Sequence, residues 1–148
     1  MFEFSKHRHM DNPANYMLSV VIPMYNEELG VKECVKRVKA VLNEMGCEHE
    51  IIFVNDGSKD KTLEYLLAEK EKETTIRVLD FSRNFGHQAA ITAGLDHANG
   101  DCVVVIDGDL QDPPELFPRM VEKWQEGFDV VHARRKKRKG ISAFADFR

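Results

Sequence analysis

The sequence lacks several features that would place a protein of this size in a class at once. It has no uninterrupted apolar run of about 18 residues, the length that a membrane-spanning helix needs, and residues 1–16 are too polar for a secretory signal. Its three cysteines, Cys34, Cys47 and Cys102, are odd in number and show no paired spacing, so buried thiols are expected rather than disulfides or a zinc site. These absences favour a cytosolic protein.

Phosphate-binding loops rich in glycine are also missing. The segment Pro-Met-Tyr-Asn-Glu at 23–27 follows the first apolar run and contains no glycine, which excludes the tight pyrophosphate turn of a Rossmann dehydrogenase, and no P-loop is present. The six histidines show no metal-ligand spacing apart from His7 and His9, so all six are interpreted as non-ligands. A phosphatase with a nucleophilic aspartate would carry its Asp-x-Asp pair on the first strand, whereas here the pair comes late in the chain.

Positive charge is concentrated near one end of the chain. The net charge is −4, yet residues 134–139 are six consecutive arginines and lysines, and the remainder holds 15 basic against 25 acidic residues. This distribution argues against a general nucleic-acid surface and indicates a local anionic partner.

Strand patterns and amphipathic helix patterns alternate from residue 18 onward. Strands are predicted at 18–23, 50–54, 76–81, 102–106 and 128–133, and helices at 31–45, after 58, after 86 and at 114–125. This alternation predicts a single α/β domain over 17–133 with a mainly parallel sheet and helices on both faces. Residues 1–16 are predicted to be a flexible arm and 134–148 a separate basic segment.

Polar residues follow every predicted strand. Because ligands of such sheets bind beyond the carboxyl ends of the strands, these polar clusters are expected to converge on one site. They are 25–27, Asp56, Arg83 with Asn84, 107–111, and Arg134 with Arg135.

The acidic segment after residue 106 is the strongest candidate for chemistry. Residues 103–106 are predicted to be a strand buried on both faces, and along an extended chain Asp107 and Asp109 would point to the same side, with Gln111 two residues further on. Such oxygen donors suit Mg²⁺ or Mn²⁺ shared with a phosphate. The alternative is an acidic turn that caps a helix; that structural role is assigned to Asp112 and Glu115.

Four motifs resemble those of the family 2 inverting glycosyltransferases with the GT-A fold, in the same order and spacing. They are Pro23–Glu27, Asn55–Ser58, Arg83–Gly86 and Asp107–Pro114, and the resemblance runs from Met17 to about Arg138. The polyprenyl-phosphate sugar transferases, the group of dolichol-phosphate mannose synthase and bactoprenol glucosyltransferase, are the most similar in appearance.

The resemblance implies three groups of site residues. The first group would line the pocket for the nucleotide's base and ribose: Pro23, Tyr25, Glu27, Asp56 and Asp107. The second would hold the Mg²⁺ or Mn²⁺ that bridges the donor's phosphates: Asp107, Asp109 and Gln111. The third would contact phosphate oxygens: Arg134 and Arg135. Asp107, Asp109 and Arg134 are the predicted catalytic residues.

The implied reaction is transfer of a hexosyl or N-acetylhexosaminyl group from a UDP- or GDP-sugar to a polyprenyl phosphate, with inversion. An acceptor that already carries a charged phosphate oxygen needs positioning more than a strong general base. A transferase acting on a saccharide or protein hydroxyl, and a non-catalytic nucleotide-binding or membrane-docking fragment, are the alternatives.

Relatives of this kind continue past the fifth strand into an acceptor-binding region, so the chain is expected to be truncated at its C-terminus. Ile141, Phe144 and Phe147 follow the basic run at helical spacing. They are consistent either with an amphipathic helix on an anionic membrane or with a frayed tail. The first reading predicts a peripheral protein at the cytoplasmic face of the membrane, held through residues 134–139.

Overall fold

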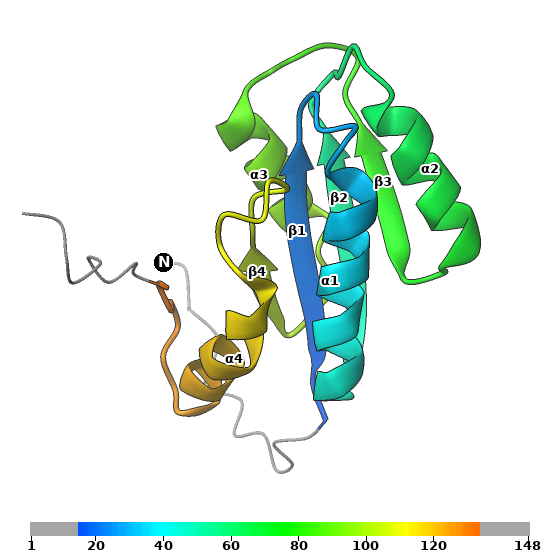
Figure 1. The fold of residues 1–148 in the computed structure, drawn as a ribbon. Helices are drawn as coiled ribbons and strands as arrows, with labels where there is room; N and C mark the ends of the chain where they lie inside the picture. The colour runs from blue at the N-terminus through cyan, green and yellow to red at the C-terminus, as the bar shows by residue number, and fades with distance from the viewer. Residues whose placement is uncertain (1–14, 134–148) are drawn as a thin grey trace, which may run out of the picture.

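The structure, a computed structural model, describes residues 15–133, and its centre is one parallel sheet (Figure 1). The strands are β1 (Met17–Met24), β2 (Glu48–Asn55), β3 (Ile76–Asp80) and β4 (Cys102–Val105), in the order β3-β2-β1-β4. Every pairing between neighbours is parallel. All four carboxyl ends therefore lie at the same edge, as the alternating sequence pattern predicts.

Helices cover both faces of the sheet, which confirms the predicted fold class (Figure 1). They are α1 (Val31–Met45), α2 (Thr62–Lys72), α3 (His87–Asp96) and α4 (Phe117–Gln125), with a 3₁₀ turn η1 (Pro114–Leu116) before α4. The side chains of α1, α2 and α4 share one core cluster with alternate residues of β1 and β2, whereas α3 packs on the opposite face of the same two strands.

The path of α3 depends on a close approach to β1. A side-chain Cβ at Gly94 would lie only 2.2 Å from Val21 Cγ1, so glycine allows the helix to contact the strand directly. Ala90, one turn earlier, is fully buried against the same face of the sheet. This packing fixes the position of His87, where α3 begins at the carboxyl edge of the sheet.

A buried carboxylate ties the amino-terminal edge of the sheet together. Glu50 is 5% exposed and accepts hydrogen bonds from Ser19 Oγ (2.7 Å), the Asn99 backbone N–H (2.6 Å) and Arg77 Nη1 (2.7 Å). Burial by itself raises the pKa of Glu50, but these hydrogen bonds together outweigh it, so the pKa lies below its usual value. Glu50 is at the opposite edge from the predicted site and stabilises the fold.

The predicted strand at 128–133 is wrong, because the structure has irregular chain there. Phe128 is 55% exposed and Val130 is 69% exposed. An apolar run of this kind forms a strand only where a neighbouring strand supplies hydrogen-bond partners, and this segment is paired with no strand within residues 15–133.

The prediction that the fourth strand is buried on both faces is also wrong. Val104 is buried, but Val103 and Val105 on the other face are 37% and 38% exposed. The reason is that β4 lies at the edge of the described sheet, while α3 packs on β1 and β2.

The predicted cap at Asp112 is not what begins the helical segment. Pro113 occupies the N-cap position of η1, without a side-chain cap hydrogen bond. The Glu115 carboxylate instead pairs with the Arg37 guanidinium on α1, with Nη2–oxygen distances of 2.8 and 3.0 Å. This contact fastens the end of the acidic segment to α1.

Several predictions concern residues outside the described range. These are most of the N-terminal arm, Arg134 and Arg135, the basic run at 134–139 and the pattern at 141–147. Tyr16, assigned to the arm, instead packs its ring edge-on with the ring of Trp124, with centroids 5.8 Å apart.

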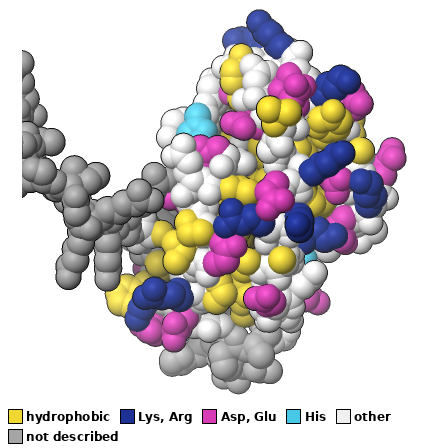
Figure 2. Space-filling model, in the orientation of Figure 1, with side chains coloured by type: hydrophobic (Ala, Val, Ile, Leu, Met, Phe, Trp, Pro, Cys, Tyr) yellow, Lys and Arg dark blue, Asp and Glu magenta, His cyan; other side chains and the backbone are white. Residues whose placement is uncertain are grey.

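On the face shown in Figure 2, the Lys and Arg side chains of the described residues are interspersed with Asp and Glu. Within residues 15–133, no helix has the length and apolar character to span a bilayer.

Candidate functional site

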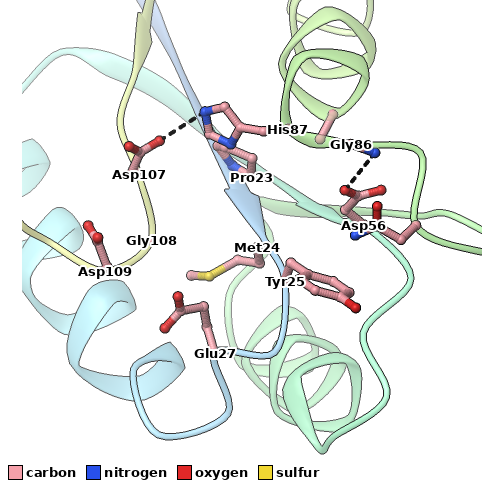
Figure 3. Close-up of a pocket in the computed structure, with 12 residues that line it drawn as sticks. Pro23, Met24, Tyr25, Glu27, Asp56, Gly86, His87, Asp107, Gly108 and Asp109 are labelled. Carbon is pink, nitrogen blue, oxygen red and sulfur yellow. Dashed lines mark hydrogen bonds and ion pairs between the residues drawn. The ribbon is translucent and has the colours of Figure 1, made fainter.

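A cavity of about 380 Å³ lies at the carboxyl edge of the sheet, where the loops after the strands meet (Figure 3). Six of the site residues that the family resemblance implies line it: Pro23, Tyr25, Glu27, Asp56, Asp107 and Asp109. Gln111 is exposed and is not among the lining residues. The loops therefore converge as the sequence predicts. Which part of a ligand each residue contacts stays a prediction.

The loop after β1 is held by hydrogen bonds to the loop after β2. Asn26 adopts a left-handed conformation (φ +53°), and its N–H donates to Ser58 Oγ at 3.0 Å. The next N–H, of Glu27, donates to Thr62 Oγ1 at 2.8 Å, and Thr62 Oγ1 in turn donates to Asp60 Oδ1. Because Thr62 is fully buried, this chain of bonds fixes the backbone from which Glu27 reaches the cavity.

Asp56 connects the second strand to the beginning of α3. Its carboxylate is 3% exposed and accepts hydrogen bonds from the backbone N–H groups of Phe85 (2.7 Å) and Gly86 (3.0 Å). Two oxygens offer about four acceptor sites, so these bonds leave acceptor capacity. The predicted contact of Asp56 with a nucleobase stays a prediction, and its observed role is to hold the loop that precedes α3.

Gly57 allows that loop to approach. Its φ is +64°, and a Cβ there would lie 2.3 Å from the backbone carbonyl carbon of Arg83. Asn84 also lines the cavity, whereas the Arg83 guanidinium packs over the Phe85 ring at 4.0 Å from the centroid. The loop from 82 to 86 therefore belongs to the wall of the cavity.

The acidic segment forms a turn and does not continue the strand. The Leu110 N–H donates to the Asp107 carbonyl at 3.2 Å, and the Gln111 N–H donates to Asp109 Oδ1 at 3.0 Å. Leu110 has φ +56°, an unusual value for a bulky residue, and its side chain packs on the core. The expected extended geometry is thus wrong, although the turn brings both carboxylates to the cavity.

Negative charge accumulates on one side of the cavity. The pKa of Glu27 is raised, first by burial and then by the negative charges of Asp109 and Asp60. A bound cation or a proton would relieve this repulsion.

The donor set fits a hard divalent cation that is shared with a ligand. Within residues 15–133, no three His, Cys, Asp or Glu side chains gather closely enough to hold a metal by themselves. Mg²⁺ in particular is commonly held by one or two carboxylates, with phosphate oxygens and water completing its coordination. Asp107 and Asp109, which both line the cavity, could supply such an incomplete site.

His87 also lines the cavity, a position that the sequence did not predict, and its interpretation as a non-ligand stays a prediction. Its Nε2 lies 3.4 Å from Asp107 Oδ1, and both side chains are about half exposed (Figure 3). Metal-ligand spacing could not find it, because it is separated from Asp107 by 20 positions. The signal that could have identified His87 is its place directly after a loop at the carboxyl edge of the sheet.

The parallel sheet and its helices match the GT-A fold of solved glycosyltransferases. One similar structure is a mannosyltransferase of Pyrobaculum calidifontis in complex with GDP-Man and Mn²⁺, with a TM-score of 0.58 and 22% identity over 66% of this chain and 29% of that one. Another is Staphylococcus aureus TarS 1–349 in complex with UDP, with a TM-score of 0.53 and 26% identity over 63% of this chain and 27% of that one.

The chain belongs to glycosyl transferase family 2, whose sequence pattern matches residues 19–145. It is 53% identical to the uncharacterized glycosyltransferase YkcC of Bacillus subtilis over 85% of this chain and 39% of the relative. It is 46% identical to the bactoprenol glucosyl transferase of Shigella phage SfV over 82% and 39%. It is 43% identical to the undecaprenyl-phosphate 4-deoxy-4-formamido-L-arabinose transferase of Pseudomonas aeruginosa over 82% and 36%. The chain thus spans about two-fifths of these relatives, and the family predicted from the motifs is confirmed.

Proposed function

We propose that this chain is the donor-binding part of an enzyme that transfers a sugar from a nucleotide-diphosphate sugar to a polyprenyl phosphate, with inversion and with a divalent cation. The observation that carries the proposal is the cavity where Asp107 and Asp109 meet residues of the other strand ends. The names of the relatives support the lipid-phosphate acceptor, since two of them act on bactoprenol or undecaprenyl phosphate according to their names.

The charges of the cavity favour a donor bound together with a cation. A nucleoside diphosphate is itself an anion, so two aspartates would repel it unless a cation is bound between them. Mg²⁺ or Mn²⁺ held by Asp107 and Asp109, with Gln111 as a further oxygen ligand, would stabilise the charge that develops on the departing diphosphate. Tyr25, which is 43% exposed at the mouth, offers its ring to a base or ribose.

The chemistry of a lipid-phosphate acceptor explains why the donor-side residues would suffice without a strong general base. A lipid phosphate attacks with an oxygen that is already charged, so the enzyme must mainly position the two substrates. We assign phosphate contacts to Arg134 and Arg135, and peripheral attachment at an anionic membrane to residues 134–139.

The donor site is tested by calorimetric binding of UDP and GDP to the 148-residue chain, each with and without Mn²⁺. Binding of one nucleotide that requires Mn²⁺ is expected, and Asp109→Asn should reduce its affinity at least tenfold. Asp96→Asn is the matched control, because Asp96 is also exposed but lies at the far end of α3.

Two results would contradict the donor assignment. One is the absence of binding by a folded sample, and the other is an equal loss of affinity in the Asp109 and Asp96 variants. The acceptor is tested separately by adding undecaprenyl phosphate in detergent, or a saccharide, to the nucleotide sugar. Transfer to the saccharide alone would overturn the lipid-phosphate assignment.

A further inference from the structure

We propose that His87 is a positioning residue that orients the Asp107 carboxylate at the cation and donor site. This inference rests on the proposed function, and it adds a residue that the motif-based assignment leaves out. The imidazole Nε2 lies 3.4 Å from Asp107 Oδ1, and His87 and Asp107 both line the cavity (Figure 3).

The fold places His87 opposite Asp107 by two independent constraints. The Asp56 carboxylate binds the N–H groups of Phe85 and Gly86, which immediately precede His87. The close contact of Gly94 with β1 fixes the same helix further along. The histidine therefore begins a helix whose position is determined from both ends.

Packing in the core does not explain why a histidine is placed at position 87. The His87 side chain is 54% exposed, so it contributes little to the core. Among the described residues, Asp107 is the one side chain with which its ring makes a polar contact. His87 follows the loop after β3 and Asp107 follows β4, two strands at opposite ends of the order β3-β2-β1-β4, so the contact joins two separate parts of the cavity wall.

The chemistry of the pair suits orientation. An imidazole nitrogen 3.4 Å from Oδ1 would restrict the rotation of the Asp107 carboxylate and leave Oδ2 to face a cation or a ribose hydroxyl. Groups that orient a metal-binding carboxylate or imidazole from the second layer commonly change metal affinity by about 10- to 100-fold when they are removed. An exposed ion pair without such a role would contribute little to stability or to binding.

The test compares His87→Ala and His87→Gln in the 148-residue chain, with His97→Ala as a control at the other end of α3. The measurements are the thermal midpoint and the affinity for the nucleotide with Mn²⁺. His87→Ala should lower the affinity about tenfold without changing the midpoint appreciably. The amide of His87→Gln can donate to the same carboxylate and should restore most of the affinity, while His97→Ala should bind as the unmodified protein does.

A double-variant cycle separates positioning from direct ligand contact. In an Asp107→Asn background, His87→Ala should cause little further loss of affinity. An additive loss would show that His87 touches the ligand itself and would overturn the positioning role. Unchanged affinity of His87→Ala alone would overturn it as well.

A ligand-free readout keeps this inference distinct from the proposed function. The ring-nitrogen NMR signals of His87 should shift in Asp107→Asn but not in Asp96→Asn. If the unmodified chain binds neither nucleotide while these signals respond to Asp107, the proposed function is wrong and the positioning contact stands. If the signals do not respond, the positioning contact is wrong.

Discussion

Gly57 and Gly46 form a matched pair that tests how the cavity wall is held. Both have φ +64°, so an alanine at either position adopts the same left-handed backbone. They differ in what the added methyl group meets. At Gly46, after α1, nothing lies within 4 Å, whereas at Gly57 the methyl carbon would lie 2.3 Å from the Arg83 carbonyl carbon and 2.5 Å from the Asn84 nitrogen.

The expected losses of stability follow from this difference. The left-handed conformation costs an L-residue about 1–2 kcal/mol, and both variants incur this cost. In Gly57→Ala the 82–86 loop must also move, which weakens the hydrogen bonds that Asp56 accepts from Phe85 and Gly86. Hydrogen bonds to a charged group contribute about 1.5–3 kcal/mol each, so weakening the two by the equivalent of one bond brings the total loss to about 3–4 kcal/mol.

Thermal and urea unfolding provide the assay. With about 3 °C per kcal/mol for a domain of this size, Gly46→Ala should lower the midpoint by about 5 °C and Gly57→Ala by about 10 °C. Gly57→Ala should also weaken nucleotide binding, because Asn84, Gly86 and His87 line the cavity, while Gly46→Ala should not. Equal midpoints for the two variants would refute the account of Gly57, since the methyl group would then have met no obstacle.

Two further substitutions test the other supports of the fold. Glu50→Gln should cost about 2 kcal/mol at pH 7, less than for a fully buried pair because the Arg77 side chain is 37% exposed. Because the pKa of Glu50 is lower in the folded protein, its carboxylate stabilises the fold fully above the unfolded pKa of about 4.3. This stabilisation is lost as the pH falls through the folded pKa. The difference in urea unfolding between the two proteins should therefore shrink progressively as the pH falls below about 4.3; a difference that does not shrink with falling pH would contradict this linkage. Thr62→Val removes the hydroxyl that accepts the Glu27 N–H, so urea unfolding should show a loss of about 1–3 kcal/mol in the free energy of unfolding. Calorimetry should show weaker nucleotide binding. The exposed Thr92→Val is its control, and equal effects would show that the buried hydroxyl has no special role.

The sequence by itself determined the class of fold and the edge of the sheet that carries the site. The spacing of Val31, Val35, Val38 and Leu42 predicts the buried face of α1 because helical periodicity is a local property of the chain. The polar residues after each apolar strand predict the cavity, since parallel strands place their carboxyl ends at one edge.

Only the tertiary structure decided which of these residues meet, and in what conformation. The exposure of Val103 and Val105 depends on the position of β4 in the sheet, which no local pattern records. The turn at Leu110 and the contact between His87 and Asp107 likewise need the packing of separate segments. Periodicity describes how side chains alternate along one element, whereas contacts across the site depend on strand order and on how closely α3 approaches the sheet, and those are fixed only when the whole chain folds.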